Sequence, residues 1–426
     1  MRFLERTDRD YESTLESLSR RSAAVPQTIE NAAREVIATV RKGGDAAIRA
    51  LTEKFEGRKL TSLEMDREQW RAQAAGVAAP VLAALERAAE RIEAFHERER
   101  YPSFEMESAG ARVGSRVTPL RRIGVYAPGG TARYPSTVLM AAIPARVAGV
   151  GEIIMTTPGP SAETLAAAEI AGVDRVFVIG GAQAIAAMAY GTESVPRVDK
   201  IVGPGNAYVA AAKRLVFGDV GIDSIAGPTE VVIMADDSVE PSWIAADLLA
   251  QAEHDVLAVP ILIALGRAVG EKIAAETSRQ VTALPRRQIA ETSLRDFGVV
   301  IVVDSIDEAI RVMNLLAPEH AELAVRDARA VAASINTAGA LFIGAHTPEP
   351  VGDYFAGPSH VLPTGGSARF ASPLGVADFV KRTSIIEYEP AALRAQGDDI
   401  ERLAEVEGLS GHARSVAART RGTTRG

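Results

Sequence analysis

The sequence predicts an α/β protein built from two doubly wound parallel sheets, with small helical segments at its N- and C-terminal ends. Short apolar runs alternate with stretches in which apolar residues recur at three- and four-residue spacing. Glycine-rich turns separate the runs from the helical stretches between residues 123 and 216. Strands that alternate with helices favour parallel pairing, because each helix carries the chain back to the edge where the next strand begins.

The first of these α/β regions is expected between residues 122 and 230. Its strands are the apolar runs at residues 123–126, 153–156, 176–179 and 200–202. The helices after them are residues 136–147, 162–170, 182–189 and 208–216. The second region has expected strands near residues 230–234, 261–264, 299–303 and 340–343, and a helix at 241–253.

The remaining segments are helical or hairpin-like. Residues 28–42 and 78–99 are expected helices, residues 104–117 an expected hairpin, and the chain after Glu387 is polar and helical. We therefore expect four parts. An N-terminal helical segment (1–20) is followed by a discontinuous α/β domain (21–121 and 231–376), into which the α/β domain with the glycine loops (122–230) is inserted. A C-terminal helical tail (377–426) is expected to serve in dimerisation.

The composition narrows the chemistry. The 426 residues include no cysteine, which excludes disulfides, thiolate nucleophiles and cysteine-based metal sites. Any metal must then be held by His, Asp, Glu or an amide oxygen. The net charge of −8 argues against a nucleic-acid partner, and no apolar run approaches the about 18 residues of a membrane span. The first residues lack the apolar stretch of a secretory signal, so we expect a cytoplasmic protein.

Three glycine-rich junctions connect strands to helices in the first α/β region. They are Ala-Pro-Gly-Gly at 127–130, Gly-Gly at 180–181 and Gly-Pro-Gly-Asn at 203–206. Helix N-termini present free N–H groups that bind phosphates, and glycine lets a ligand approach the backbone. None of the three is a dinucleotide fingerprint or a P-loop, and each alone is equally typical of a tight turn. Neighbouring parallel strands would bring them to one sheet edge, where ligands bind.

The histidines differ in their surroundings. His96 lies among charged residues on a helix, which indicates a solvated position; His346 lies in a loop and His412 in the polar tail. His254 is distinct because Gln251 precedes it by three residues and shares its helix face. An amide oxygen and an imidazole there offer two metal ligands. The alternative is a histidine that interacts with the helix C-terminal dipole.

Acidic residues accompany two further histidines. Asp353 and His360 lie in a stretch rich in Gly and Pro, which predicts an ordered loop, either functional or shaped by an Asx-turn. Glu319 and His320 follow Pro318 directly. Such a pair can serve two different proton transfers, but Pro followed by Glu is also typical of the first turn of a helix.

Taken together, these segments resemble the histidinol dehydrogenase family over nearly the whole chain. The motifs that carry the resemblance are, in chain order, Gly-Val-Tyr-Ala-Pro-Gly-Gly (124–130), Gly-Gly-Ala-Gln-Ala (180–184), Gly-Pro-Gly-Asn (203–206), Gly-Pro-Thr-Glu (227–230), Gln-Ala-Glu-His-Asp (251–255), Pro-Glu-His (318–320), Gly-Asp-Tyr (352–354), Gly-Pro-Ser-His (357–360) and Glu-Gly-Leu (407–409) with His412. The resemblance implies two Rossmann-like doubly wound domains in an aldehyde-dehydrogenase-like architecture. It also implies oxidation of L-histidinol to L-histidine through the aldehyde, with two NAD and one water.

The resemblance implies a role for each residue of the site. Glu319 and His320 would be the acid–base pair. One zinc ion per subunit would be held by Gln251, His254, Asp353 and His412. These four residues, with Thr229, His320, His360 and Glu407, would contact the substrate. The NAD site would be lined by Tyr126, Gln183 and Asn206. Members of the family form homodimers, in which the histidine matching His412 reaches the zinc of the partner chain.

Thr229 departs from the family pattern, because many members have serine there. Threonine keeps the hydroxyl and its hydrogen bonds, while the added methyl group could tighten the pocket. Two other functions stay open. One is a zinc- and NAD-dependent dehydrogenase of another primary alcohol, such as a sulfonated diol; the presence of Glu407 and His412 favours an imidazole–amine substrate instead. The other is a non-catalytic protein that binds NAD and zinc, against which Glu319 and His320 argue.

Overall fold

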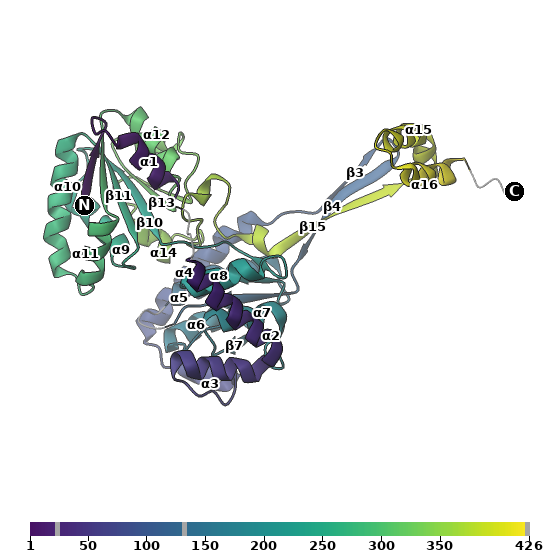
Figure 1. The fold of residues 1–426 in the computed structure, drawn as a ribbon, viewed down its shortest axis with the longest axis horizontal. Coiled ribbons are helices and arrows are strands. Elements are labelled where there is room, and N and C mark those ends of the chain that lie inside the picture. The colour runs from purple at the N-terminus through teal and green to yellow at the C-terminus, as the bar shows by residue number, and fades with distance from the viewer. Residues whose placement is uncertain (22–25, 130–133, 422–426) are drawn as a thin grey trace. The chain divides into compact units, whose positions relative to one another are not determined.

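The computed structural model describes residues 1–21, 26–129 and 134–421 (Figure 1). The chain divides into two compact units. Unit 1 comprises residues 1–99 and 120–379, and unit 2 comprises residues 100–119 and those from 380 onward. In the described residues, unit 1 contains two six-stranded sheets and unit 2 contains a three-stranded sheet. The predicted α/β class with two mainly parallel sheets is therefore confirmed.

Sheet I of unit 1 is parallel throughout. Its strands, in spatial order, are β1 (Arg2–Glu5), β12 (Val299–Val303), β11 (Val259–Leu265), β10 (Glu230–Ala235), β13 (His320–Ala324) and β14 (Ala340–Ile343). One face is covered by α9 (Pro241–Ala252), α10 (Arg267–Gln280) and α11 (Arg287–Asp296), and the other by α1 (Tyr11–Ser19), α12 (Ile306–Leu316) and α13 (Ala328–Ala332).

Alternating side chains of β10 show why both faces of sheet I are covered. Val231 and Ile233 pack under α9 and α10, whereas Val232 and Met234 pack under α1 and α12. Successive side chains of a strand point to opposite faces, so a continuous apolar run requires helices on both sides. The strand β1 also shows that the predicted helical segment at residues 1–20 supplies an edge strand.

Sheet II is parallel except for its first strand, β2. Its strands, in spatial order, are β2 (Glu64–Met65), β7 (Arg175–Phe177), β6 (Glu152–Thr156), β5 (Arg122–Tyr126), β8 (Lys200–Val202) and β9 (Gly221–Ile222). One face is covered by α3 (Arg67–Ala74), α4 (Ala79–His96), α5 (Pro135–Ala148) and α6 (Ala162–Ala171), and the other by α2 (Gln27–Glu56), α7 (Gly181–Tyr190) and α8 (Ala207–Val216).

The helices α2, α3 and α4 therefore pack on sheet II, whereas the sequence grouped residues 21–121 with 231–376. The physical reason is that an amphipathic pattern identifies the buried face of a helix without identifying the sheet that it covers. The short elements of unit 1 are α14 (Glu349–Tyr354) and the 3₁₀ turns η1 (Glu97–Glu99), η2 (Val281–Ala283), η3 (Ser367–Arg369) and η4 (Val376–Phe379).

Unit 2 pairs the predicted hairpin with a strand from the C-terminal tail. The hairpin strands β3 (Phe104–Ser108) and β4 (Ala111–Pro119) are antiparallel, and β15 (Val380–Tyr388) pairs with β4. The tail at residues 377–426 was expected to be helical, but its first part is this strand. None of the nine strand residues is buried, so the sequence lacks the apolar run that would have predicted a strand. The helices α15 (Pro390–Val406) and α16 (Ser410–Thr420) follow. Among the described helices of both units, none has the length and apolar character needed to cross a membrane.

Candidate active site

The predicted acid–base pair lies at the amino ends of two neighbouring parallel strands, β10 and β13. The register sets Val231 opposite His320, which brings the residues just before β13 beside those that begin β10. The Oε2 atom of Glu319 accepts hydrogen bonds from the Thr229 hydroxyl at 2.7 Å and from the Glu230 N–H at 2.9 Å. The alternative of a helix start after the proline is wrong, because His320 is the first residue of a strand.

The hydrogen bonds of His320 define its tautomer. Its Nδ1 atom lies 3.0 Å from the carbonyl oxygen of Glu230, and a carbonyl oxygen only accepts, so Nδ1 carries the hydrogen. In the neutral ring, Nε2 is then unprotonated. Within the described residues this buried Nε2 has no hydrogen-bond partner, and it lies 3.9 Å from Oδ1 of Asp353. His320 therefore presents a free base toward the aspartate.

Buried carboxyl groups surround this histidine. Burial raises the pKa of Glu319 well above its usual range, and hydrogen bonds from Thr229 and Glu230 oppose the shift. Burial likewise raises the pKa of Glu349 to about 8, although the nearby His320 acts to lower it. The Oε1 atom of Glu349 lies 3.7 Å from Nδ1 of His320. Perturbed carboxyl groups of this kind are typical of sites of proton transfer.

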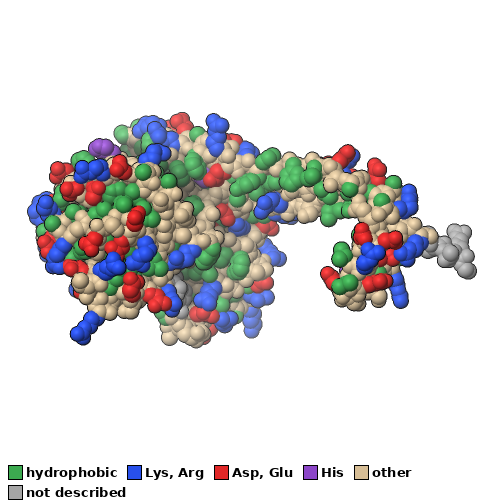
Figure 2. All heavy atoms as spheres, turned by 90° about the horizontal axis from the view of Figure 1, so that it is seen from above, with side chains coloured by type: hydrophobic (Ala, Val, Ile, Leu, Met, Phe, Trp, Pro, Cys, Tyr) green, Lys and Arg blue, Asp and Glu red, His purple; other side chains and the backbone are tan. Residues whose placement is uncertain are grey.

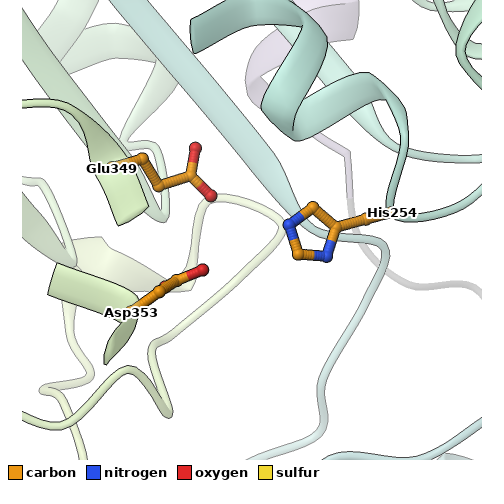
Figure 3. Close-up of side chains that lie close together, drawn as sticks. All are labelled: His254, Glu349 and Asp353. Carbon is orange, nitrogen blue, oxygen red and sulfur yellow. The ribbon is translucent and has the colours of Figure 1, made fainter. Parts of the chain in front are cut away.

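A group of three possible metal ligands lies next to the histidine. One donor atom from each of His254, Glu349 and Asp353 lies within 4.8 Å of the others (Figure 3). His254 follows α9, while Glu349 and Asp353 are four residues apart on α14 and so share one face of that helix. His254 and Asp353 were expected from the sequence, whereas Glu349 was not.

The helix α14 explains this omission. The segment around Asp353 was expected to be a loop because of its Gly and Pro content, but residues 349–354 form a short helix. Pro348 is its N-cap and Pro350 lies in its first turn, where a proline removes no helical hydrogen bond. The Oε1 atom of the buried Glu322 accepts the N–H of Glu349 at 2.7 Å and so caps the helix. The i, i+4 spacing of two acidic residues was the signal available in the sequence.

Gln251 and His254 have properties that suit metal ligands. The Nε2 atom of the fully buried Gln251 donates to the Thr229 hydroxyl at 2.9 Å. Its Oε1 atom has no hydrogen-bond partner in the described part of the chain, so an acceptor oxygen is left for another ligand. Burial lowers the pKa of His254, which keeps the imidazole in the neutral form that metals bind.

His360 connects α14 to the helices of sheet II. Its Nδ1 donates to the carbonyl oxygen of Asp353 at 2.9 Å, and its Nε2 lies 3.3 Å from the Thr137 hydroxyl on α5. Burial lowers its pKa. A cavity of about 120 Å³ adjoins His320, Asp353 and His360 and is otherwise lined mainly by apolar groups, including Phe342. The space is large enough for part of a small substrate beside the histidines.

The glycine loops lie at the carboxyl ends of sheet II. The Tyr126 hydroxyl, at the end of β5, accepts the N–H of Gly181 at 3.1 Å and so joins two of the loops. Gly203 has a φ of +112°, and a Cβ atom there would lie 2.2 Å from the carbonyl oxygen of Tyr126. Asn206 caps α8 by accepting from the N–H groups of Tyr208 and Val209. Gly130, the last residue of its motif, lies outside the described residues.

Comparisons with known proteins identify the family. A family model described as histidinol dehydrogenase matches residues 19–420. A histidinol dehydrogenase of Geobacter sulfurreducens is 49% identical over 98% of this chain and 100% of its own length, and one of Aquifex aeolicus is 47% identical over 98% of both. The chain belongs to the histidinol dehydrogenase family. A crystal structure of histidinol dehydrogenase from Elizabethkingia anophelis agrees with the fold, with a TM-score of 0.93, 34% identity and coverage of 99% of this chain and 98% of that one.

Membership of the histidinol dehydrogenase family makes the chain an NAD-dependent oxidoreductase that acts on an alcohol or aldehyde. Two residues expected in its site, Glu407 and His412, belong to unit 2. Glu407 is the C-cap of α15 and His412 lies in the first turn of α16. The group of His254, Glu349 and Asp353 in unit 1 forms without them.

Two histidines lie away from the site. His96 was expected on the surface, but it is fully buried at the end of α4, where its Nδ1 lies 2.7 Å from Oε2 of Glu99. The same oxygen accepts the N–H of Val376, so one of the charged neighbours of His96, Glu99, is a partner of the buried ring rather than a sign of exposure. His346 lies in an exposed loop as expected, with its ring 5.4 Å from that of Trp243.

Proposed function

We propose that the chain oxidises L-histidinol to L-histidine through the bound aldehyde, using two NAD and one water. The observation that carries the proposal is the contact between the Glu319–His320 pair and Asp353 of the metal-ligand group. It supports a site where proton transfer and substrate positioning occur within a few ångströms of each other. NAD, when bound, accepts the hydride in each of the two oxidation steps.

His320 is proposed to take the proton of the alcohol. The hydrogen bond from Nδ1 to the Glu230 carbonyl fixes the ring and leaves Nε2 free as the base. The bond also stabilises the imidazolium that forms, because a protonated ring still donates from Nδ1. An unpartnered, oriented Nε2 supports this role, because a general base must be able to reach the proton that it removes.

Glu319 is proposed to activate water for the second oxidation. The chain has no cysteine to form a thioester, so the aldehyde must be hydrated before it can lose another hydride. The pKa of Glu319 is raised by burial, which makes its carboxylate a stronger base than an exposed one. The two hydrogen bonds at Oε2 fix the orientation of the carboxyl group.

The proposed zinc ligands are Gln251, His254 and Asp353 of one chain and His412 of a second copy. The unpartnered Oε1 of Gln251 and the lowered pKa of His254 support this ligand set, and the absence of cysteine agrees with it. A bound zinc ion would hold the imidazole and amine of the substrate and so orient the alcohol, rather than activate water. Manganese has the same kind of ligands and is the alternative metal.

Thr229, His360 and Glu407 are proposed to contact the substrate, together with the metal ligands and His320. The hydroxyl of Thr229 already accepts from Gln251 and donates to Glu319, so its main contribution is to link the metal ligand to the acid–base pair. The cavity beside His320 and His360 supports this placement of the substrate.

Tyr126, Gln183 and Asn206 are proposed to line the NAD site. The tyrosine and the asparagine are engaged in holding the glycine loops, and the Nε2 of the buried Gln183 lies 3.4 Å from Oε1 of Glu56. This supports a site shaped by these side chains, in which loop N–H groups approach the cofactor.

A homodimer is proposed, with His412 reaching the site of the partner chain. Unit 2 carries exposed apolar side chains on its strands and on α15. Figure 2 shows those of the strands gathered together. They include Phe104, Met106, Ile386 and Val406, which are between 54% and 82% exposed. Apolar surface of this kind is typical of a protein interface. The cytoplasmic location stays a prediction.

The test is NADH formation by the purified chain with L-histidinol, with and without a metal chelator. We expect about two NADH for each histidine formed, because each oxidation step reduces one NAD, and loss of turnover after chelation. Turnover of another primary alcohol but not of histidinol would contradict the proposed substrate. Binding of NAD and zinc without any turnover would contradict catalysis altogether.

A further inference from the structure

Glu230 contacts both members of the acid–base pair without belonging to it. Its N–H donates to Oε2 of Glu319 at 2.9 Å, and its own Oε1 accepts the N–H of Glu319 at 3.2 Å. Its carbonyl oxygen accepts from Nδ1 of His320 at 3.0 Å. One residue therefore holds the carboxylate and the backbone of Glu319 and sets the tautomer of His320.

The charge of Glu230 is balanced by Arg21. The Nε atom of Arg21 lies 2.8 Å from Oε2 of Glu230, and the two side chains are only 12% and 1% exposed. The guanidinium also donates to the carbonyl oxygens of Leu18, in the last turn of α1, and Leu316, at the end of α12. A carboxylate buried to this degree is destabilising unless it is paired and hydrogen-bonded, so the position of Glu230 depends on Arg21.

We propose that Glu230, neutralised by Arg21, is a positioning residue that holds Glu319 and His320 in their reactive geometry. The proposal rests on the proposed roles of those two residues. The direct contacts from the Glu230 side chain are to Arg21 and to the backbone of Glu319, so its carboxylate acts through the pair. Through Arg21, the ends of α1 and α12 are connected to Glu230 and so to the proposed acid–base pair.

A double-mutant cycle separates positioning from simple stability. Arg21→Met leaves the buried carboxylate unpaired, so we expect kcat with histidinol to fall about 10- to 100-fold, the size of effect that a small misplacement of reacting groups produces. The KM values for histidinol and NAD are expected to change by less than about threefold, because the metal and NAD residues are held by other contacts. Zinc content per chain should stay unchanged.

The double variant Arg21→Met/Glu230→Gln is expected to regain most of the lost kcat. Glutamine keeps the oxygen that accepts from Glu319 and removes the unpaired charge, so the two changes are strongly non-additive. The matched control is Arg20→Met, because Arg20 is the preceding residue and its side chain forms an exposed ion pair with Glu16. It should leave kcat and KM unchanged.

The outcomes distinguish the two proposals. No turnover by the unchanged chain would refute the proposed function, and the positioning role with it. Turnover that Glu319→Gln impairs but Arg21→Met leaves intact would refute the positioning role alone. So would a loss in Arg21→Met that the double variant shares in full. If Arg21→Met does not fold, Glu230→Gln takes its place: we expect a loss of kcat that the addition of Arg21→Met reverses, and additive losses would overturn the proposal.

Discussion

Replacement of Glu349 by glutamine is expected to stabilise the metal-free protein at pH 8 but much less at pH 5.5. Glu349 is 2% exposed, and burial raises its pKa from 4.5 to about 8. Below pH 4.5 the carboxyl group is protonated in both the folded and the unfolded chain, so it has no pH-dependent effect. Between pH 4.5 and 8 the unfolded chain releases the proton while the folded chain keeps it, and the free energy of unfolding falls.

The size of the effect follows from the pKa shift. One pKa unit corresponds to about 1.4 kcal/mol. The rise in the pKa from 4.5 to about 8 therefore lowers the free energy of unfolding by at most about 5 kcal/mol, at pH 8 and above. At pH 5.5 this destabilisation is only about 1.4 kcal/mol. Glutamine does not ionise, so Glu349→Gln should gain about 3 kcal/mol more at pH 8 than at pH 5.5. The helix cap is preserved, because Glu322 accepts from the backbone N–H of residue 349.

The assay is calorimetric unfolding of both proteins at pH 5.5 and pH 8 after removal of metal by a chelator. Glu319 and Glu322 also have raised pKa values, but both proteins contain them, so their contribution cancels in the comparison. Glu90→Gln on the exposed face of α4 is the matched control. It should change the free energy of unfolding by the same amount at both pH values. An equal shift by Glu349→Gln at both pH values would refute the reasoning, because it would mean that residue 349 is ionised in the folded chain.

Three further outcomes concern the reaction. Glu319→Gln should slow oxidation of the aldehyde by about 10²- to 10⁴-fold, the usual worth of a general base, and oxidation of the alcohol far less; equal losses in single-turnover NADH measurements would end the division of roles. Thr229→Ser should keep kcat/KM within about threefold, whereas Thr229→Ala should lower it about tenfold or more, because the hydroxyl links Gln251 to Glu319. Mixed dimers of inactive His320→Ala and His412→Ala chains should regain activity, since one site has both histidines if His412 acts across the interface; no recovery in verified mixed dimers would place the site within one chain.

The sequence predicted those elements whose pattern is local. The strands and helices between residues 123 and 216 were recovered, because apolar runs and helical spacing alternate there without interruption. The hairpin at residues 104–117 was recovered from a different local signal, the short runs of residues around Gly110 and Gly114. The approach of His254 to Asp353, about a hundred residues later, came from the resemblance, since no spacing rule connects α9 to α14.

Features that depend on distant contacts were not predictable. Glu230 and Arg21 are far apart in the sequence and meet only in the folded chain. The parallel pairing of β10 with β13 brings Glu230 beside Glu319. His96 was misjudged because charged residues beside it suggested solvent, whereas Glu99 turns inward to meet it. The glycine loops proposed for NAD and the proposed acid–base pair lie at opposite strand ends of their sheets. The loops follow the carboxyl ends of sheet II, as in other α/β proteins, while Glu319 precedes the amino end of β13.

The placement of the proposed acid–base pair at the start of β13 separates the residues that can be varied from those that must stay fixed. β13 is an inner strand, bound on both sides by β10 and β14, so any shift of its backbone disturbs two hydrogen-bonded ladders at once. The cavity beside it is instead lined by Leu341, Val351 and Leu362, of which Val351 lies on the short helix α14 and Leu362 in a loop. A library confined to these three side chains would reshape the space offered to a substrate while leaving the proton chemistry on its rigid support.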